Sequence, residues 1–458
     1  MAARPNILVI LVDDLRFDEF GAGGHPYMKT PAIDRIAGEG ALFERAFHTT
    51  PICSPNRASI LTGQYASRHG IIDNVARDAA SHRIPNYHLA LQRLGYGTAH
   101  IGKWHMGNDG KPRPGYDFWV AYDGHGRLFD PRLNENGEYV QHQGYVTDVM
   151  NTMAVDFVTR RHDKPWSLWF AHKAVHPDAE QAADGTFRMD GYRTAERHKD
   201  LYRGCVFPKK PNMQTVAEIV KQKPAWAEAL ELRKNKQSRE LLDAIHAGTQ
   251  EEIRLRAAMM ASVDEGVGML FEALERTGQL DNTFLLFLGD NGYFFGEHGL
   301  GPERRFAYEE GIRSPFLARY PRRIKPGTRL RDLVICQDIA PTLIELAGGK
   351  PGPQIQGRSL LPLLAGRRAG WRKSFLMEYW AENAYPWLIG MTYKAVRTRR
   401  HKYIHWVNRG ASGELDELYD LDRDPYELKN VATRPAYRAV RASLRRELRR
   451  LVADAAGL

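Results

Sequence analysis

NILVILVDD, residues 6–14, is an uninterrupted apolar run that ends in two adjacent carboxylates. Seven apolar or amide residues without polar alternation are typical of a strand that is buried on both faces of a parallel sheet. Asp13 and Asp14 then lie at the carboxyl end of that strand, where open α/β sheets bind their ligands. Capping of a following helix needs one carboxylate, whereas two repel each other unless a cation or hydrogen-bond donors neutralise them. The pair therefore predicts a metal site.

The pattern of a buried strand followed by polar residues recurs along the chain. A second strand is predicted over 98–102 and leads into Lys103 and His105, and a third over 166–171 leads into His172 and His176. A fourth, over 283–288, ends in Asp290 and Asn291. Together with Asp13 and Asp14, the last two supply oxygen donors with no added His or Cys, which favours Ca²⁺ or Mg²⁺ over zinc.

Cys53-Ser54-Pro55-Asn56-Arg57 is the other stretch that carries chemistry. Ser54 is a favoured N-cap and Pro55 suits the first helical turn, so the thiol of Cys53 is expected at a helix N-terminus, which favours anions. A lone Cys is about as often a small buried apolar residue. Cysteine-dependent phosphatases place five residues between Cys and Arg, and three stand here between Cys53 and Arg57. That class is therefore excluded.

The motif Cys-x-Pro-x-Arg, followed by ASILTG at 58–63, resembles the signature of the type I sulfatases of the alkaline-phosphatase-like superfamily. Further blocks similar to that family follow in the family's order: GKWHMG at 102–107, the stretch ending in His176-Pro177, GEHG at 296–299 and YEEGIRSP at 308–315. His176 is the match to the family's histidine, and His172 is read as its structural neighbour. The joint match of five blocks is far more specific than any one of them.

The resemblance implies the cofactors. In this family a maturation enzyme oxidises the cysteine to formylglycine, whose hydrate is the nucleophile, so Cys53 would be the formylglycine precursor. The family holds a divalent cation, usually Ca²⁺, with Mg²⁺ as the alternative. The implied metal ligands in this chain are Asp13, Asp14, Asp290, Asn291 and residue 53 itself.

The resemblance also implies roles for the remaining site residues. Arg57 and Lys103 would stabilise the nucleophile and the charge that develops on sulfate, His176 would assist the leaving alcohol, and His105 would take the proton that releases sulfate. The family's lysine before Tyr-Glu-Glu is absent here, and Arg304 or Arg305 stands in its place. Arginine binds sulfate but does not donate a proton near neutral pH.

The predicted fold class is α/β, with a mostly parallel central sheet sandwiched by helices and a smaller C-terminal α+β domain. The catalytic domain is expected over residues 1–370, with 178–250 as an insertion that faces the substrate or solvent. Residues 371–458 are expected to form an antiparallel sheet and a terminal helix, the second and third strands joined as a hairpin. The aromatic stretch 378–387 is expected to line a sugar pocket or to fill the domain interface.

Composition limits the class of protein. The chain has 458 residues, 43% of them hydrophobic, and a formal net charge of +10, which suits acidic substrates, although many arginines fall on the predicted terminal helix. Three distant cysteines form neither a disulfide framework nor a zinc site. No signal peptide or membrane span is recognised, so the expected location is the cytoplasm if residue 1 is the natural start, and the periplasm or exterior if a signal peptide was removed. There is no nucleic-acid recognition motif.

The predicted function is hydrolysis of a sulfate monoester, first on a sulfated carbohydrate and otherwise on a small aryl or alkyl sulfate. The expected partners are that sulfated substrate and the formylglycine-generating maturation enzyme. Two alternatives remain at this point. One is a phosphonate or phosphate ester hydrolase on the same fold, and the other is a non-catalytic protein that binds sulfated glycans with Cys53 unconverted.

Overall fold

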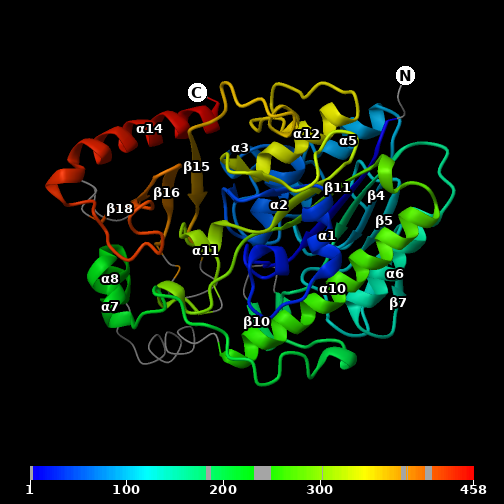
Figure 1. The fold of residues 1–458 in the computed structure, drawn as a ribbon, viewed down its shortest axis with the longest axis horizontal. Coiled ribbons are helices and arrows are strands. Elements are labelled where there is room, and N and C mark those ends of the chain that lie inside the picture. Colours follow the sequence, from blue (N-terminus) through cyan, green and yellow to red (C-terminus); the bar gives the residue numbers. More distant parts are fainter. Residues whose placement is uncertain are drawn as a thin grey trace.

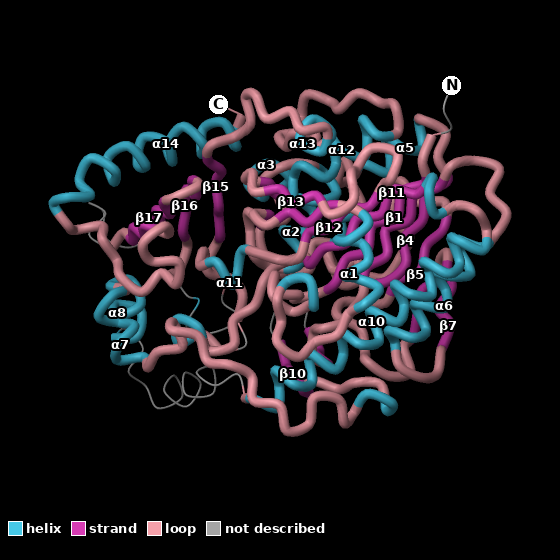
Figure 2. Tube along the Cα trace, in the orientation of Figure 1, coloured by secondary structure: helices cyan, strands magenta, loops and turns pink. Residues whose placement is uncertain are grey.

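A ten-stranded β-sheet lies at the centre of the computed structural model, which describes residues 4–181, 187–231, 249–301, 303–382, 388, 390–407 and 415–457 (Figures 1 and 2). The strands from β11 to β5 run parallel, β12 is antiparallel to both of its neighbours, and β6 and β7 are antiparallel additions at one edge. In spatial order they are β13 (Thr328–Leu330), β2 (Ala41–Phe43), β12 (Phe316–Arg319), β11 (Thr283–Gly289), β1 (Asn6–Val12), β8 (Trp166–Ala171), β4 (Gly97–Gly102), β5 (Phe118–Ala121), β6 (Arg132–Glu135) and β7 (Glu138–Gln141).

Strand β1 is the middle of this sheet and divides two hydrophobic cores. Its register pairs Leu8 with Leu285 on one side and with Leu168 on the other. Successive side chains of a strand point to opposite faces, so Leu8 and Ile10 enter one core while Val9 and its odd-numbered neighbours enter the second. The uninterrupted apolar run 6–12 is thus explained by burial on both faces, as predicted.

Helices cover both faces of the sheet, which confirms the predicted sandwich (Figure 1). One group of helices packs on the first core, and a second group, including the helix that begins at Cys53, packs on the second. The first group is α1 (Pro31–Glu39), α6 (Val146–Thr159) and α10 (Gln250–Arg276). The second is α2 (Cys53–Thr62), α5 (Tyr87–Arg93) and α12 (Ile339–Leu346). Short helices α3 (Ala66–His69), α4 (Asp78–Ser81), α11 (Glu309–Ile312) and α13 (Leu361–Leu364) lie in the connections.

A second, four-stranded antiparallel sheet is formed by the C-terminal residues and lies at the left of Figure 1. Helix α14 (Arg438–Ala456) packs on it through Leu444 and Leu448, while Arg446 and Arg449 face solvent. The predicted antiparallel sheet, hairpin and terminal helix are therefore confirmed; the domain boundary at residue 370 stays a prediction. The strands are β15 (Ser374–Tyr379), β16 (Tyr393–Thr398), β17 (His401–Trp406) and β18 (Glu417–Asp420).

Three local predictions need correction. Helix α2 begins at Cys53, with Ile52 at the N-cap, because the Ser54 hydroxyl donates to the carbonyl of His105 instead of capping the helix. The segment 41–47, whose apolar residues suggest a single strand, is divided into β2 and β3 (Ala46–Phe47), and β3 pairs with β14 (Val334–Ile335) in a separate sheet. In the connection after β8, the chain forms an unpredicted hairpin of β9 (Asp178–Gln181) and β10 (Phe187–Gly191).

The rest of the predicted insertion is only partly described. Helices α7 (Val216–Gln222) and α8 (Pro224–Glu231) lie in it, whereas residues 232–248 of the insertion and 383–387 of the aromatic stretch lie outside the described residues. In the described ranges, no helix combines the length and apolar character that crossing a membrane requires.

A buried ion pair joins the C-terminal sheet to the helical layer of the main sheet. The carboxylate of Asp338 lies at the start of α12 and is fully buried, and both of its oxygens accept from the guanidinium of Arg372, just before β15. The same carboxylate accepts the backbone N–H groups of Ile335 at 3.0 Å and Arg358 at 2.8 Å. One side chain thus satisfies four donors from three segments.

Asp338→Ala is expected to lower the free energy of unfolding by about 3–5 kcal/mol, because it leaves a buried guanidinium without its partner. Urea denaturation followed by circular dichroism measures the change. Arg331→Ala is the matched control, since Arg331 pairs with Glu44 at the surface and its loss should cost less than about 1 kcal/mol. Equal effects of the two substitutions would contradict the assignment.

Candidate active site

The carboxyl ends of β1, β8, β4 and β11 meet at one edge of the sheet, and the N-terminus of α2 faces the same place. Each of these strands is followed directly by polar residues that were predicted for the site. Their side chains lie within hydrogen-bonding or ion-pair networks of one another, so the structure brings the predicted set together. The members are Asp13, Asp14, Cys53, Arg57, Lys103, His105, His176, Asp290, Asn291 and Arg304, all at most 5% exposed.

Three buried carboxylates are balanced by three cations from other segments. Lys103 Nζ donates to Asp13 Oδ2, and Arg57 Nε donates to Asp290 Oδ2 at 2.8 Å, while a terminal nitrogen of Arg57 forms an ion pair with the same oxygen at 2.8 Å. Arg304 Nε lies 3.2 Å from Asp14 Oδ1, which also accepts from Asn291 Nδ2 at 2.8 Å. This pairing lets like charges share a buried site.

The pKa values of the three carboxyl groups show how far the nearby cations compensate their charges. Burial would raise the pKa of the Asp13 carboxyl, but Lys103 above all and other nearby cations hold it well below its usual range. Burial raises the pKa of Asp14, and burial together with the neighbouring Asp13 charge raises the pKa of Asp290 to about 7. The protein's own cations therefore compensate Asp13 fully and the other two carboxylates in part.

Three acceptor oxygens in this network fit a cation. Asp13 Oδ1, Asp14 Oδ2 and Asn291 Oδ1 are buried and have no hydrogen-bond donor among the described residues. Buried acceptors are normally satisfied, so three of them close to further carboxylate charge point to an ion. Ligand atoms of Asp13, Cys53 and Asp290 also lie within 4.8 Å of one another. The predicted donor set therefore fits a hard divalent ion such as Ca²⁺ or Mg²⁺.

Cys53 lies beside this oxygen cluster and is completely buried. Its Sγ is 3.9 Å from Asp14 Oδ1 and 3.8 Å from a terminal nitrogen of Arg304. Burial raises the pKa of the thiol, and the charge of Asp13 raises it further, so the unmodified side chain is a protonated thiol at neutral pH. Arg305 instead pairs with Glu303 at 2.9 Å and Glu382 at 2.6 Å, so Arg304 is the arginine that faces residue 53.

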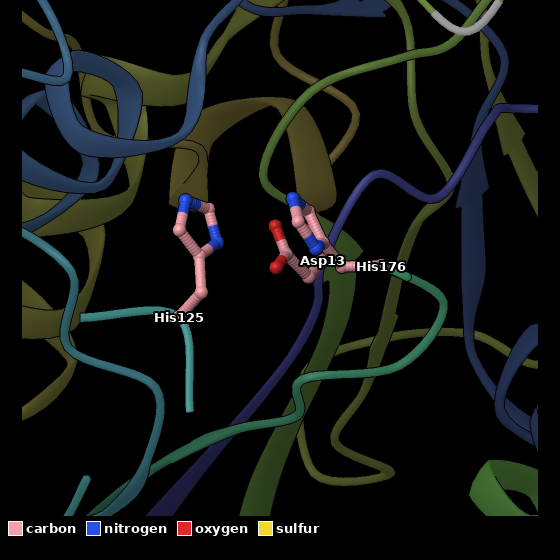
Figure 3. Close-up of side chains that lie close together, drawn as sticks. All are labelled: Asp13, His125 and His176. Atoms are coloured by element: carbon pink, nitrogen blue, oxygen red, sulfur yellow. The ribbon is translucent and has the colours of Figure 1, made fainter. Parts of the chain in front are cut away.

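Three histidines, His105, His125 and His176, lie close together near Asp13, and His125 was not predicted. The ring of His125 stacks on that of His176, with centroids 4.4 Å apart, and contacts the tilted ring of His105 at 3.9 Å; its Nδ1 lies 3.1 Å from Lys103 Nζ. Figure 3 shows the side chains of Asp13, His125 and His176 close together. His125 follows β5, the next parallel strand beyond β4, so recognising that strand would have found it.

The tautomer of His176 is set by a backbone group. Its Nδ1 lies 2.9 Å from the carbonyl oxygen of Pro177, which only accepts, so Nδ1 carries the proton. Nε2 is then the nitrogen turned toward the carboxylates, 3.9 Å from Asp14 Oδ2. His172 is buried against Phe170, with its pKa lowered by burial to about 3, and is not part of this network.

The backbone that carries the site is held by Arg256 of α10, a residue that sequence reasoning did not single out. Arg256 donates to the carbonyl of Asp14 at 2.7 Å and to that of Val175 at 3.3 Å, and it pairs with buried Glu19 at 2.7 Å. The two loops also bond directly, since the N–H of Val175 donates to the carbonyl of Asp13 at 2.8 Å. One buried arginine thus joins the loop after β1 to the loop after β8.

Comparison with known proteins assigns the chain to a family. A model of the Sulfatase family matches residues 5–349, and a model of the N-sulphoglucosamine sulphohydrolase C-terminal region matches residues 296–454. An N-acetylglucosamine-6-O-sulfatase of Bacteroides thetaiotaomicron is 28% identical over 98% of this chain and 86% of its own length. A choline-sulfatase of Rhizobium meliloti is also 28% identical, over 94% of this chain and 83% of its own length.

A solved structure of BT4656 in complex with its substrate D-glucosamine-2-N,6-O-disulfate superposes with a TM-score of 0.83 at 27% identity, and it covers 99% of this chain and 98% of that chain. The alkaline-phosphatase-like fold expected from the sequence is thereby confirmed. The family model spans most of the chain, including the segments that carry Asp13, Cys53, His176 and Asp290. This chain belongs to the sulfatase family of hydrolases.

Proposed function

We propose that this chain hydrolyses a sulfate monoester on a saccharide, with residue 53 converted to formylglycine and Ca²⁺ held beside it. The observation that carries the proposal is the convergence of Cys53 with three buried acceptor oxygens that lack donors among the described residues. In a member of the sulfatase family, that convergence supplies a place for the nucleophile and the cation together.

The state of the thiol supports conversion of residue 53. A buried cysteine whose pKa is raised by burial and by nearby carboxylate charge is a poor thiolate nucleophile. Formylglycine, when hydrated, supplies one hydroxyl for attack at sulfur and a second whose deprotonation allows sulfate to leave. Arg304, 3.8 Å from the Sγ position, carries a permanent charge, so we assign it to binding the sulfate oxygens and not to proton transfer.

Asp13, Asp14, Asp290 and Asn291 would hold the cation, and residue 53 would complete the set. A divalent ion held there would polarise the sulfate group and offset the repulsion among the carboxylates. Lys103 and Arg57 then have two roles. They orient Asp13 and Asp290 through their hydrogen bonds, and they add positive charge where the sulfate oxygens develop negative charge. Arg57 is itself held by a hydrogen bond of 2.6 Å to the carbonyl of Lys103.

The histidines provide the proton transfers. Because the carbonyl of Pro177 holds one proton of His176 on Nδ1, the imidazolium form carries its second proton on Nε2, and we assign donation to the leaving alcohol to that atom, which leaves the neutral imidazole. The ring of His105 contacts that of His125, with centroids 3.9 Å apart, and we assign His105 to the hydroxyl that loses its proton when sulfate is released. Lys103 is in contact with both Asp13 and His125, so it links the proton-transfer side of the site to the metal side.

Two comparisons support a saccharide substrate. The Bacteroides thetaiotaomicron relative is an N-acetylglucosamine-6-O-sulfatase, and the BT4656 structure holds a glucosamine disulfate. The choline-sulfatase relative has the same identity to this chain, so a small alkyl sulfate is the direct competitor. Comparing kcat/KM for glucosamine-6-sulfate and choline sulfate therefore tests the substrate class.

Residue 53 is expected to be an aldehyde in protein that is produced together with a formylglycine-generating enzyme. Peptide mass spectrometry over residue 53 detects the loss of the thiol, and the same protein should cleave an aryl sulfate in preference to the matching phosphate ester. Cys53→Ala should abolish this activity, whereas Cys205→Ala, at a half-buried cysteine outside the site, should retain it. Phosphate cleavage by protein with an unmodified Cys53 would favour a phosphoesterase instead.

Removal of divalent ions with a chelator should abolish activity, and Ca²⁺ should restore it. Isothermal titration of Ca²⁺ into chelator-treated Asp14→Asn protein is expected to show an affinity about 10- to 100-fold below that of the wild type, because one charged ligand is lost. Asp18→Asn is the control: its carboxylate follows the same strand but pairs with Arg16 and Lys210 and should leave the affinity unchanged. Chelated protein that takes up neither Ca²⁺ nor Mg²⁺ would disprove the site.

His176→Ala is expected to lower kcat/KM for a sugar sulfate about 10²- to 10⁴-fold, the usual contribution of a positioned acid. The loss should be much smaller for 4-nitrophenyl sulfate, whose leaving group needs no proton. His172→Gln, at the buried histidine outside the network, should keep the wild-type ratio of the two rates. Equal losses on both substrates would assign His176 a structural role.

A further inference from the structure

A hollow with a volume of about 620 Å³ lies between one edge of the main sheet and the C-terminal sheet. Its walls come from the segment after β1 near Phe17, the turn after β2 near Arg45, the segment before β12 near Arg313, and Arg397 of β16. Asp13, Cys53 and the other members of the candidate active site do not line it. It is therefore a separate feature of the molecule.

Basic side chains outnumber acidic ones in this hollow, and most of them are paired. Arg397 donates to Glu309 at 2.9 Å, Arg329 pairs with Glu44 at 3.1 Å, and Lys210 pairs with Asp18 at 2.6 Å. Arg313 donates to the carbonyl of Glu44 at 2.9 Å and lies over the ring of Phe17. Each of these cations has an acceptor within the protein.

Arg45 is the exception. Within the described part of the chain, its guanidinium forms no hydrogen bond or ion pair, and one of its terminal nitrogens is buried. The charges that act on it are those of three other guanidiniums, Arg397, Arg399 and Arg313, against one carboxylate, that of Glu309, which itself pairs with Arg397. Burial lowers the pKa of Arg45, and these three positive charges lower it further. A half-buried cation among cations is costly unless an anion joins it.

We propose that this hollow binds an oxyanion, a sulfate, phosphate or carboxylate group, through the guanidinium of Arg45 with Arg313 and Arg397 close by. A planar guanidinium binds such groups through two parallel hydrogen bonds, which would satisfy the buried nitrogen of Arg45. The aromatic rings of Phe17 and half-exposed Tyr426 line the same hollow and suit a sugar ring that carries the anion. The site does not take part in hydrolysis, so it stands whether or not the proposed activity does.

Thermal unfolding in sodium sulfate and in sodium chloride of equal ionic strength tests the proposal. Without sulfate, Arg45→Gln should be at least as stable as the wild type, because repulsion is relieved. With sulfate, the wild type should gain more stability than Arg45→Gln. The affinity of this variant for sulfate at this site should be lower by a factor of at least about ten. Arg329→Gln, in the same hollow but paired with Glu44, should respond like the wild type.

Sulfate bound at the active site, or general salt effects, would act on all three proteins alike, so the difference between variants reports the hollow. Identical sulfate responses of the wild type and Arg45→Gln would overturn the proposal. A second measurement uses the wild type alone: inorganic sulfate should slow modification of Arg45 by phenylglyoxal, read by peptide mass spectrometry, but not that of exposed Arg331. Unprotected Arg45 would likewise overturn it.

The source of the anion is separated by repeating the protection experiment with heparin fragments. If the group is carried by a saccharide, the fragments should protect Arg45 at a lower concentration of sulfate groups than inorganic sulfate does. If the free anion is the ligand, the two protect equally at equal concentrations of sulfate groups. Protection by neither probe is the result that counts against the site.

Discussion

Burial of three carboxylates at one edge of the sheet is the constraint on which the rest of this structure depends. Asp13, Asp14 and Asp290 are fully buried, and unpaired charges in such a place would destabilise the fold by several kcal/mol each. Their partners come from three other parts of the chain, namely Arg57 of α2, Lys103 after β4 and Arg304 before α11. The native arrangement of these segments is therefore required for stability as well as for chemistry.

The parts of the fold that sequence reasoning reached are those with a strong local signal. Strands buried on both faces, such as 6–12 and 283–289, stand out as apolar runs because each side chain enters one of two cores. Since parallel strands place their carboxyl ends at the same edge, the polar residues that follow them had to converge. Asp13, Lys103 and Asp290 were thus placed together without knowledge of the contacts, whereas His176 was chosen over His172 from the resemblance to the sulfatase family.

The parts that were missed depend on contacts between distant segments. β5, β6 and β7 have four residues each, and β6 and β7 are antiparallel additions at the edge of the sheet. None of them therefore shows as a long apolar run, and His125 was missed with them. Ser54 has the composition of an N-cap, but a tertiary hydrogen bond to His105 takes its hydroxyl. Arg256 lies on an amphipathic helix whose apolar stripe predicts packing, while its bonds to two loop carbonyls depend on the folded arrangement alone.

The position of Arg256 has a consequence for how substitutions combine. Because one guanidinium bonds the backbone beside both Asp14 and His176, a change that displaces it disturbs the metal side and the proton-transfer side at once. Free-energy changes add when sites are independent and fail to add when they share a partner. Substitutions in the loop after β1 and in the loop after β8 are therefore energetically coupled through Arg256. Once a first substitution has broken the hydrogen bonds of Arg256, a second one in the other loop should lower the free energy of unfolding by less than it does alone.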